Sequence, residues 1–209
     1  MEVHMLDNKG FDLWADEYDQ SIGLSDEKHT YPFAGYKNVL GYIYEVVMQK
    51  KNASILDIGF GTGILTTKLY EQGYTIYGQD FSSKMIALAN EKMTNANLYQ
   101  GDFTEGLVEP LKHQHYDFII ATYSLHHLTD NQKVSFLHSL LELLNNHGQI
   151  LIGDVSFSTR KELEKCRQEH SKEWDEDEFY FVVDELRNHF PSLLFTPLSF
   201  CAGVITITT

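Results

Sequence analysis

A glycine-rich loop constrains this chain more than any other feature of its sequence. The stretch Ile55-Leu-Asp-Ile-Gly-Phe-Gly-Thr-Gly63 runs from an apolar, strand-like segment into a helical pattern that begins near Ile64. Glycine at alternate positions lets the backbone turn sharply and approach a ligand closely, and the following helix presents unpaired N–H groups with a positive dipole. The loop therefore predicts a strand–turn–helix unit that binds an adenosine-type ligand.

The spacing of the glycines separates two kinds of nucleotide site. A dinucleotide site favours Gly-x-Gly-x-x-Gly. Counted from Gly59, the third glycine comes one residue early, and counted from Gly61, the place of the third glycine is taken by Thr66. A carboxylate at the end of the next expected strand, Asp80, follows Gly63 by 17 residues. At that place it can accept hydrogen bonds from both ribose hydroxyls. The pattern thus disfavours an NAD site and favours another adenosine ligand.

Short β-rich segments alternate with helical patterns from Ala53 onward, which is typical of a parallel sheet covered by helices on both faces. Apolar side chains at Val134, Leu137, Leu141 and Leu144 recur at three- and four-residue spacing and predict an amphipathic helix on the sheet. Another helix is expected over residues 33–48, and one or two charged helices between 159 and 190. The short connection at 199–202 predicts that the last two strands pair antiparallel. The expected strands are Ser54–Ile58, Thr75–Gln79, Ala96–Tyr99, Tyr116–Ala121, Gln149–Val155, Leu193–Leu198 and Gly203–Thr208.

Four motifs resemble those of class I methyltransferases that use S-adenosylmethionine (SAM), in particular the small stand-alone bacterial type. They are Leu56–Gly63, Asp80–Met85, Gln100–Phe103 and Tyr116–Ala121. The resemblance implies an α/β fold, a Rossmann-like three-layer αβα sandwich with a mostly parallel seven-stranded sheet and an antiparallel last strand. Residues 1–209 would form a single domain, with an N-terminal helical cap at 1–50 and the Rossmann-like core at 51–209.

The same resemblance implies a role for each part of the cofactor site. The loop glycines line the methionine part of SAM, Asp80 holds the ribose, and Asp102 accepts a hydrogen bond from the adenine amino group. An N-cap role is the alternative for Asp102, because Asp commonly begins helices. The aromatic residues Trp14, Tyr18 and Tyr36 either face the cofactor from the cap or pack in the core. The expected cofactor-binding set is Asp57, Gly59, Gly61, Gly63, Asp80, Phe81, Asp102, Phe103, Thr122, Tyr18 and Tyr36.

Two adjacent histidines follow the fourth expected strand, at the sheet edge where open α/β folds bind ligands. A sulfonium donor carries an already activated methyl group, so the enzyme mainly has to position the acceptor. His126 and His127 are candidate general bases, because a neutral imidazole with a pKa of about 6.5 accepts a proton near neutral pH. A structural role is the alternative. No metal is expected, because His113-x-His115 and His126-His127 occupy separate loops without a cysteine cluster or a His-Glu-x-x-His motif.

An acidic segment precedes three aromatic residues in the last third of the chain. A solvated helix surface is the favoured interpretation of Glu173–Glu178, with a docking site as the alternative. The aromatic residues Phe179–Phe181 either line an acceptor pocket or pack beneath a helix, and both interpretations stay open.

Charge and cysteine content restrict the partners. Thirty acidic residues against 16 basic ones give a net charge of −14, which repels polyphosphate, so we expect a small-molecule acceptor and no nucleic acid. No apolar stretch approaches the roughly 20 residues of a membrane helix, and the N-terminus lacks a secretory pattern, so a cytoplasmic protein without membrane attachment is expected. Cys166 and Cys201 are expected to be free thiols.

The sequence therefore predicts a SAM-dependent methyltransferase that acts on a small molecule by in-line displacement, and it sets no oligomeric state. One alternative is a SAM-binding sensor or partner subunit without turnover. The other is an RNA or protein methyltransferase of the same fold.

Overall fold

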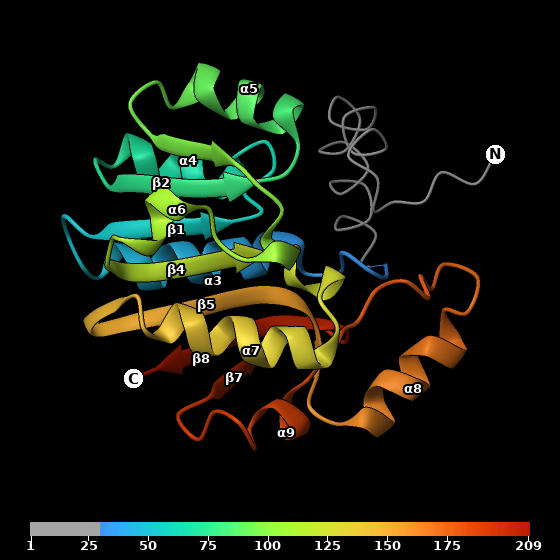
Figure 1. Cartoon of the computed structure of the whole chain (residues 1–209). Helices are drawn as coiled ribbons and strands as arrows, with labels where there is room; N and C mark the ends of the chain where they lie inside the picture. The colour runs from blue at the N-terminus through green and yellow to red at the C-terminus, as the bar shows by residue number, and fades with distance from the viewer. Residues whose placement is uncertain (1–29) are drawn as a thin grey trace.

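The computed structural model describes residues 30–209, which are built around one mixed β-sheet (Figure 1). Its strands are β1 (Ser54–Ile58), β2 (Thr75–Asp80), β3 (Asn97–Gln100), β4 (Tyr116–Thr122), β5 (Leu144–Phe157), β6 (Phe181–Val182), β7 (Leu194–Pro197) and β8 (Ala202–Thr208). The order across the sheet is β3-β2-β1-β4-β5-β8-β7, and β6 pairs with the end of β5. Strands β1 to β5 pair in parallel, whereas β8 runs antiparallel to both β5 and β7.

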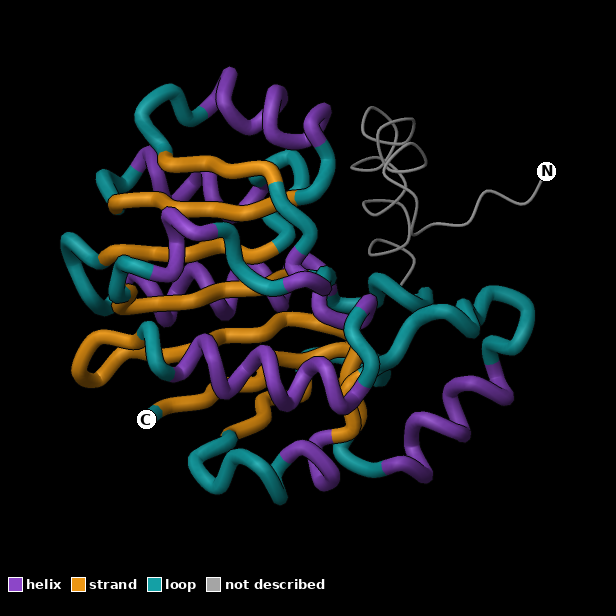
Figure 2. The backbone as a smooth tube through the Cα atoms, in the orientation of Figure 1, coloured by secondary structure: helices purple, strands orange, loops and turns teal. Residues whose placement is uncertain are grey.

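Helices lie on both faces of this sheet, which makes three layers (Figure 2). The helical elements are α3 (Tyr36–Met48), α4 (Ile64–Glu71), α5 (Ser83–Lys92), η1 (Phe103–Glu105), α6 (Glu109–Lys112), η2 (Leu125–His127), α7 (Asp130–Leu141), α8 (Arg160–Glu169) and α9 (Val183–Leu186). One buried cluster joins α3, α4 and α8 to the sheet, and a second joins α6, α7 and α9 to it.

The alternation of side chains along β1 shows how the sequence builds these layers. Ile55 belongs to the cluster that contains Val39 and Ile43 of α3. Its neighbour Leu56 belongs to the opposite cluster, which contains Leu137 of α7. Successive side chains of a strand point to opposite faces, so an apolar strand serves two helical layers at once.

All seven expected strands are present, and the last two pair antiparallel as predicted. The main deviation lies in β5, which begins at Leu144 although the spacing predicts this residue in the preceding helix. Helix α7 already ends at Leu141, and Leu144 pairs with Tyr116 across an irregularity in the ladder. Strand β6, with only two residues, is absent from the sequence-based expectation. The Rossmann-like αβα fold is confirmed.

Helix α3 lies against the sheet, although the resemblance places residues 1–50 in a cap. Val39, Ile43 and Val47 recur at four-residue spacing and are fully buried. The helix begins at Tyr36 rather than at Phe33, after a left-handed Gly35. The aromatic stretch of the expected cap, residues 11–19, lies outside the described residues.

Two further expectations concern the cysteines and the membrane. Cys166 and Cys201 are buried free thiols, as predicted. Within residues 30–209, every helix is too short or too polar to cross a lipid bilayer.

Candidate active site

A pocket opens where the carboxyl ends of β1, β2 and β4 meet, the edge at which open α/β sheets bind ligands. Tyr36 and Leu40 of α3 contribute to one wall. Of the described residues that the sequence assigned to the site, those that line the pocket are Tyr36, Asp57, Gly59, Gly61, Asp80, Phe81, Phe103, Thr122 and His127. Gly63, Asp102 and His126 do not line it, and Tyr18 and Trp14 lie outside the described residues.

The glycine loop lines this pocket, and its conformation requires glycine. Gly59, Gly61 and Gly63 have φ values of 68°, 56° and 75°, which L side chains rarely adopt. At Gly59 a Cβ atom would also lie 2.5 Å from the Cβ of Ser124, which follows β4. The chain segments that follow β1 and β4 therefore pack closely beside the pocket, and only glycine leaves room for a ligand to approach the backbone there.

Asp80 ties the end of β2 to this loop. Its Oδ2 accepts a 2.8 Å hydrogen bond from the backbone N–H of Gly61, and its Oδ1 accepts a 2.9 Å bond from the N–H of Ser82. The side chain is only 4% exposed. A carboxylate has about four lone-pair sites, so Asp80 can also accept from ribose hydroxyls.

Asp57 lies beneath the loop at the end of β1. It is buried and accepts a hydrogen bond from the hydroxyl of Thr66 in α4. Burial raises the pKa of Asp57 to about 7, the bond from Thr66 opposes this rise, and the charge of Asp80 adds to it. Asp57 therefore holds a proton far more readily than an exposed carboxyl.

Asp102 is the N-cap residue of η1 in the structure. This residue is exposed, and its Oδ1 accepts a 2.8 Å hydrogen bond from the N–H of Thr104, which caps η1. Its neighbour Phe103 is buried, lines the pocket and stacks on Phe136 with ring centroids 6.3 Å apart. The expected adenine contact of Asp102 stays a prediction.

Two tyrosines, Tyr36 and Tyr123, also line the pocket, and the sequence-based site included only Tyr36. Tyr123 has a φ of 49°, and its ring packs on Tyr36 and Phe33 with centroids 5.1 and 5.5 Å apart. A positive φ at a bulky residue is a strained conformation that clusters at functional sites. Its place two residues after the fourth expected strand, which ends at Ala121, is the signal that the sequence offers.

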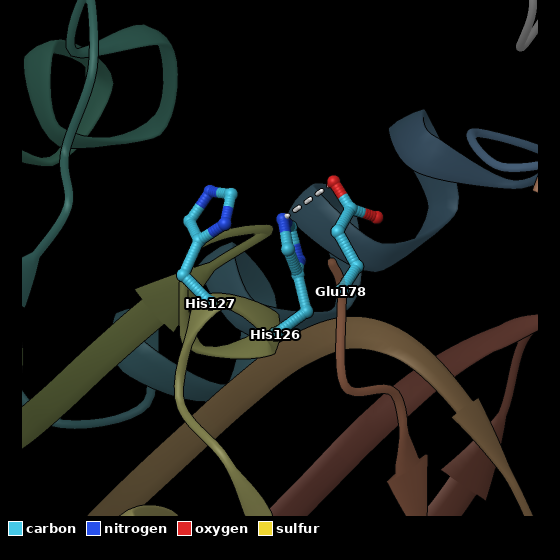
Figure 3. A group of neighbouring side chains, drawn as sticks. All are labelled: His126, His127 and Glu178. Atoms are coloured by element: carbon cyan, nitrogen blue, oxygen red, sulfur yellow. Dashed lines mark ion pairs between the residues drawn. The ribbon is translucent and has the colours of Figure 1, made fainter. Parts of the chain in front are cut away.

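The two histidines occupy different environments (Figure 3). His126 is buried, with Nδ1 2.8 Å from Oδ1 of Asp154 and Nε2 3.5 Å from Oε1 of Glu178. Burial lowers its pKa, but Asp154 and Glu178 outweigh this and raise the pKa of His126 to about 9. His127 lines the pocket, and burial followed by the charge of His126 lowers its pKa to about 3. Neither imidazole keeps the ordinary pKa on which the sequence argument relied.

Sequence reasoning missed both carboxylates around His126. Asp154 lies near the end of β5, and Glu178 belongs to the acidic segment interpreted as solvated surface. The neighbouring residues Phe179–Phe181 do not line the pocket: Tyr180 and Phe181 are buried in the core and Phe179 is 40% exposed. This favours the packing interpretation for the aromatic residues.

The mostly parallel sheet, the glycine loop and the carboxylate at the end of β2 define a class I methyltransferase, the class whose methyl donor is SAM. Residues 55–148 match the model of the methyltransferase domain family. An uncharacterized methyltransferase of Anoxybacillus flavithermus is 34% identical over 200 residues, which cover 90% of this chain and 91% of the relative. The chain therefore belongs to the methyltransferases.

Solved structures with the same fold include two ligand complexes. The complex of DhpI with SAM and HEP has a TM-score of 0.69 and 19% identity, with 100% of both chains covered. The magnesium protoporphyrin IX methyltransferase of Synechocystis PCC 6803, solved with SAH, has a TM-score of 0.66 and 16% identity, with 85% of each chain covered.

Proposed function

We propose that this methyltransferase transfers the methyl group of SAM to a small-molecule acceptor by in-line displacement. The observation that carries the proposal is the pocket itself, which joins the glycine loop and Asp80 to an aromatic wall formed by Tyr36 and Tyr123. SAM supplies a methyl group on a positively charged sulfur that is a good leaving group. The residues of the chain then have to bind, orient and exclude water.

The binding roles follow from the placement of the polar groups. We assign the methionine part of SAM to the loop at Gly59 and Gly61 and the ribose to Asp80. Asp102 would turn from its capping position on η1 to meet the adenine amino group, next to the buried ring of Phe103. These assignments place the methyl end of the cofactor toward Thr122 and His127, which also line the pocket.

The proposal of a small acceptor is supported by the charge of the chain and by the pocket wall. With a net charge of −14 the chain repels nucleic acid, and the described pocket wall is aromatic and contains no Lys or Arg. A compact, partly apolar molecule fits such a wall better than a phosphate-rich polymer. The protoporphyrin methyltransferase of Synechocystis shows that the fold serves acceptors other than macromolecules.

Incubation with isotopically labelled SAM and a metabolite extract tests the proposal. Mass spectrometry should reveal one or more products heavier by a labelled methyl group, with matching formation of S-adenosylhomocysteine. The Asp80→Ala variant serves as the control and should give neither. Tight SAM binding without any labelled product in metabolite, RNA and protein fractions would indicate a sensor, and label confined to RNA or protein would replace the small acceptor.

A further inference from the structure

Two imidazoles and a carboxylate meet beside the pocket, although they come from distant parts of the chain. Within residues 30–209, His126, His127 and Glu178 can each place one ligand atom so that all three atoms lie within 4.8 Å of one another. Figure 3 shows the two rings on η2 and the carboxylate of Glu178 on the facing segment, with its oxygen directed at His126. Two histidines and one carboxylate are a recurrent ligand set for zinc and for other divalent first-row metals.

The ring of His126 is held in the orientation that a metal ligand needs. Its Nδ1 lies 2.8 Å from the carboxylate of Asp154, which is 1% exposed and also accepts the N–H of Val155 at 2.8 Å. This leaves Nε2 facing Glu178 at 3.5 Å. Histidines that bind metals commonly donate the other ring N–H to a carboxylate in this way, which sets the tautomer and the ring orientation.

Glu178 is held by a second set of contacts. The hydroxyl of Tyr180 donates to Oε2 of Glu178 at 2.5 Å, and the hydroxyl of Tyr31 donates to that of Tyr180. The backbone N–H of Phe179 donates to the carbonyl of His126 at 2.7 Å, which fixes the two segments together. One oxygen of Glu178 is thus occupied by Tyr180, and the other is left on the side of His126.

The charges around the cluster suit a dication. Asp154 and Glu178 both face His126, and the nearby ammonium of Lys133 donates to Asp130 at 3.2 Å and to the carbonyl of Phe179. Asp130 also lies 3.7 Å from Arg160, but Arg160 pairs more closely with Glu185, at 2.6 Å. Asp130 is therefore left to match the charge of Lys133. A divalent cation with neutral imidazoles would balance the remaining two carboxylates, because two negative charges then meet two positive ones.

We propose that His126, His127 and Glu178 bind a divalent cation of the zinc class. Zinc takes imidazole nitrogen together with carboxylate oxygen, whereas magnesium and calcium favour oxygen ligands. This departs from the sequence-based expectation of no metal, which considered only ligands close together in the chain. His127 belongs to the cluster and also lines the cofactor pocket, so a fourth ligand can come from the pocket. We assign this fourth coordination position to the heteroatom of the methyl acceptor, an assignment that rests on the proposed function.

Calorimetric titration of the metal-free full chain with Zn²⁺ tests the site, and Co²⁺ absorption reports the ligand set. We expect one tight site per chain, with affinity reduced at least about 10-fold in Glu178→Gln and His127→Ala and about 10–100-fold in Asp154→Asn. His115→Ala, which changes an exposed histidine elsewhere, should bind Zn²⁺ as the wild type does. Circular dichroism of each variant verifies that it folds.

The proposal is overturned if the wild type has no stoichiometric Zn²⁺ site, or if folded Glu178→Gln and His127→Ala bind Zn²⁺ as well as the wild type. A parallel titration with SAM separates this result from the proposed function. Normal SAM binding by a chain that ignores Zn²⁺ would remove the metal and leave the methyltransferase assignment intact.

Discussion

The carboxylate of Asp80 lies 2.8 Å from the backbone nitrogen of Gly61, so the acid at the end of β2 directly braces the glycine loop that follows β1. The two residues come from separate motifs of the sequence and meet only because β1 and β2 pair in parallel, with Ile58 opposite Gln79. Cofactor affinity should therefore depend on Asp80 twice, through its own contacts and through the shape of the loop.

Replacement of Asp80 by alanine tests this dependence. Hydrogen bonds to a charged group contribute about 1.5–3 kcal/mol each, so loss of two ribose contacts should weaken SAM binding about 10²–10⁴-fold. Isothermal titration calorimetry measures the dissociation constant. Glu91→Ala, an exposed carboxylate on α5, is the control and should bind SAM normally. An unchanged dissociation constant in folded Asp80→Ala would remove the residue from the site.

Gly59→Ala should destabilise the protein and weaken cofactor binding. The new Cβ would meet Ser124 at 2.5 Å, and the φ of 68° adds a penalty of about 1–2 kcal/mol for a residue with a side chain. Gly41→Ala is the matched control, because Gly41 lies in α3 and a methyl group added there would have no neighbouring atom within 4 Å. That change should stabilise the protein by roughly 0.5–1 kcal/mol. Urea unfolding compares the two, and equal midpoints would contradict the strain argument.

The buried carboxyl of Asp57 should make the free energy of unfolding depend on pH. Its pKa is raised to about 7 in the folded protein, so in the unfolded chain it loses its proton at much lower pH. The stabilising contribution is complete below about pH 4 and is lost as the pH rises toward 7. In Asp57→Asn, measured without SAM, this part of the decline should vanish. Parallel wild-type and variant curves between pH 4 and 7 would show that Asp57 ionises normally.

His127 lines the pocket and is one of the three proposed cation ligands, and its lowered pKa keeps the imidazole neutral at pH 7, the form that coordinates a metal. If the cation that His127 is proposed to hold positions the acceptor, His127→Ala should reduce kcat about 10²-fold or more while the SAM dissociation constant changes little. Formation of S-adenosylhomocysteine with the identified acceptor provides the rate. His115→Ala should keep the wild-type rate, and the same rate in His127→Ala would show that this ring takes no part in methyl transfer.

The predictable part of the fold is the part with short-range signals. Apolar residues in a short run predicted strand β1 at Ser54–Ile58. The glycine loop at 59–63 predicted which edge of the sheet binds the cofactor, because the conformations that glycine adopts are local properties of the chain. The sequence-based assignments are wrong where pairing between strands determines the secondary structure. Leu144 has the spacing of a helix residue, but it pairs with Tyr116 in the sheet, and the two-residue strand β6 exists only because β5 is there to bind it.

The features of the site likewise separate into those set by local sequence and those set by tertiary contacts. By itself the sequence determined the αβα architecture, the position of the glycine loop and the position of Asp80 at the end of β2. These features rest on local backbone preference and on the spacing between neighbouring motifs. Only the tertiary structure decided that Asp154 and Glu178 surround His126, 28 and more residues away along the chain, and that Tyr123 faces Tyr36. Burial and the charges of sequence-distant groups set an imidazole's pKa and partners, and no local pattern encodes those distances.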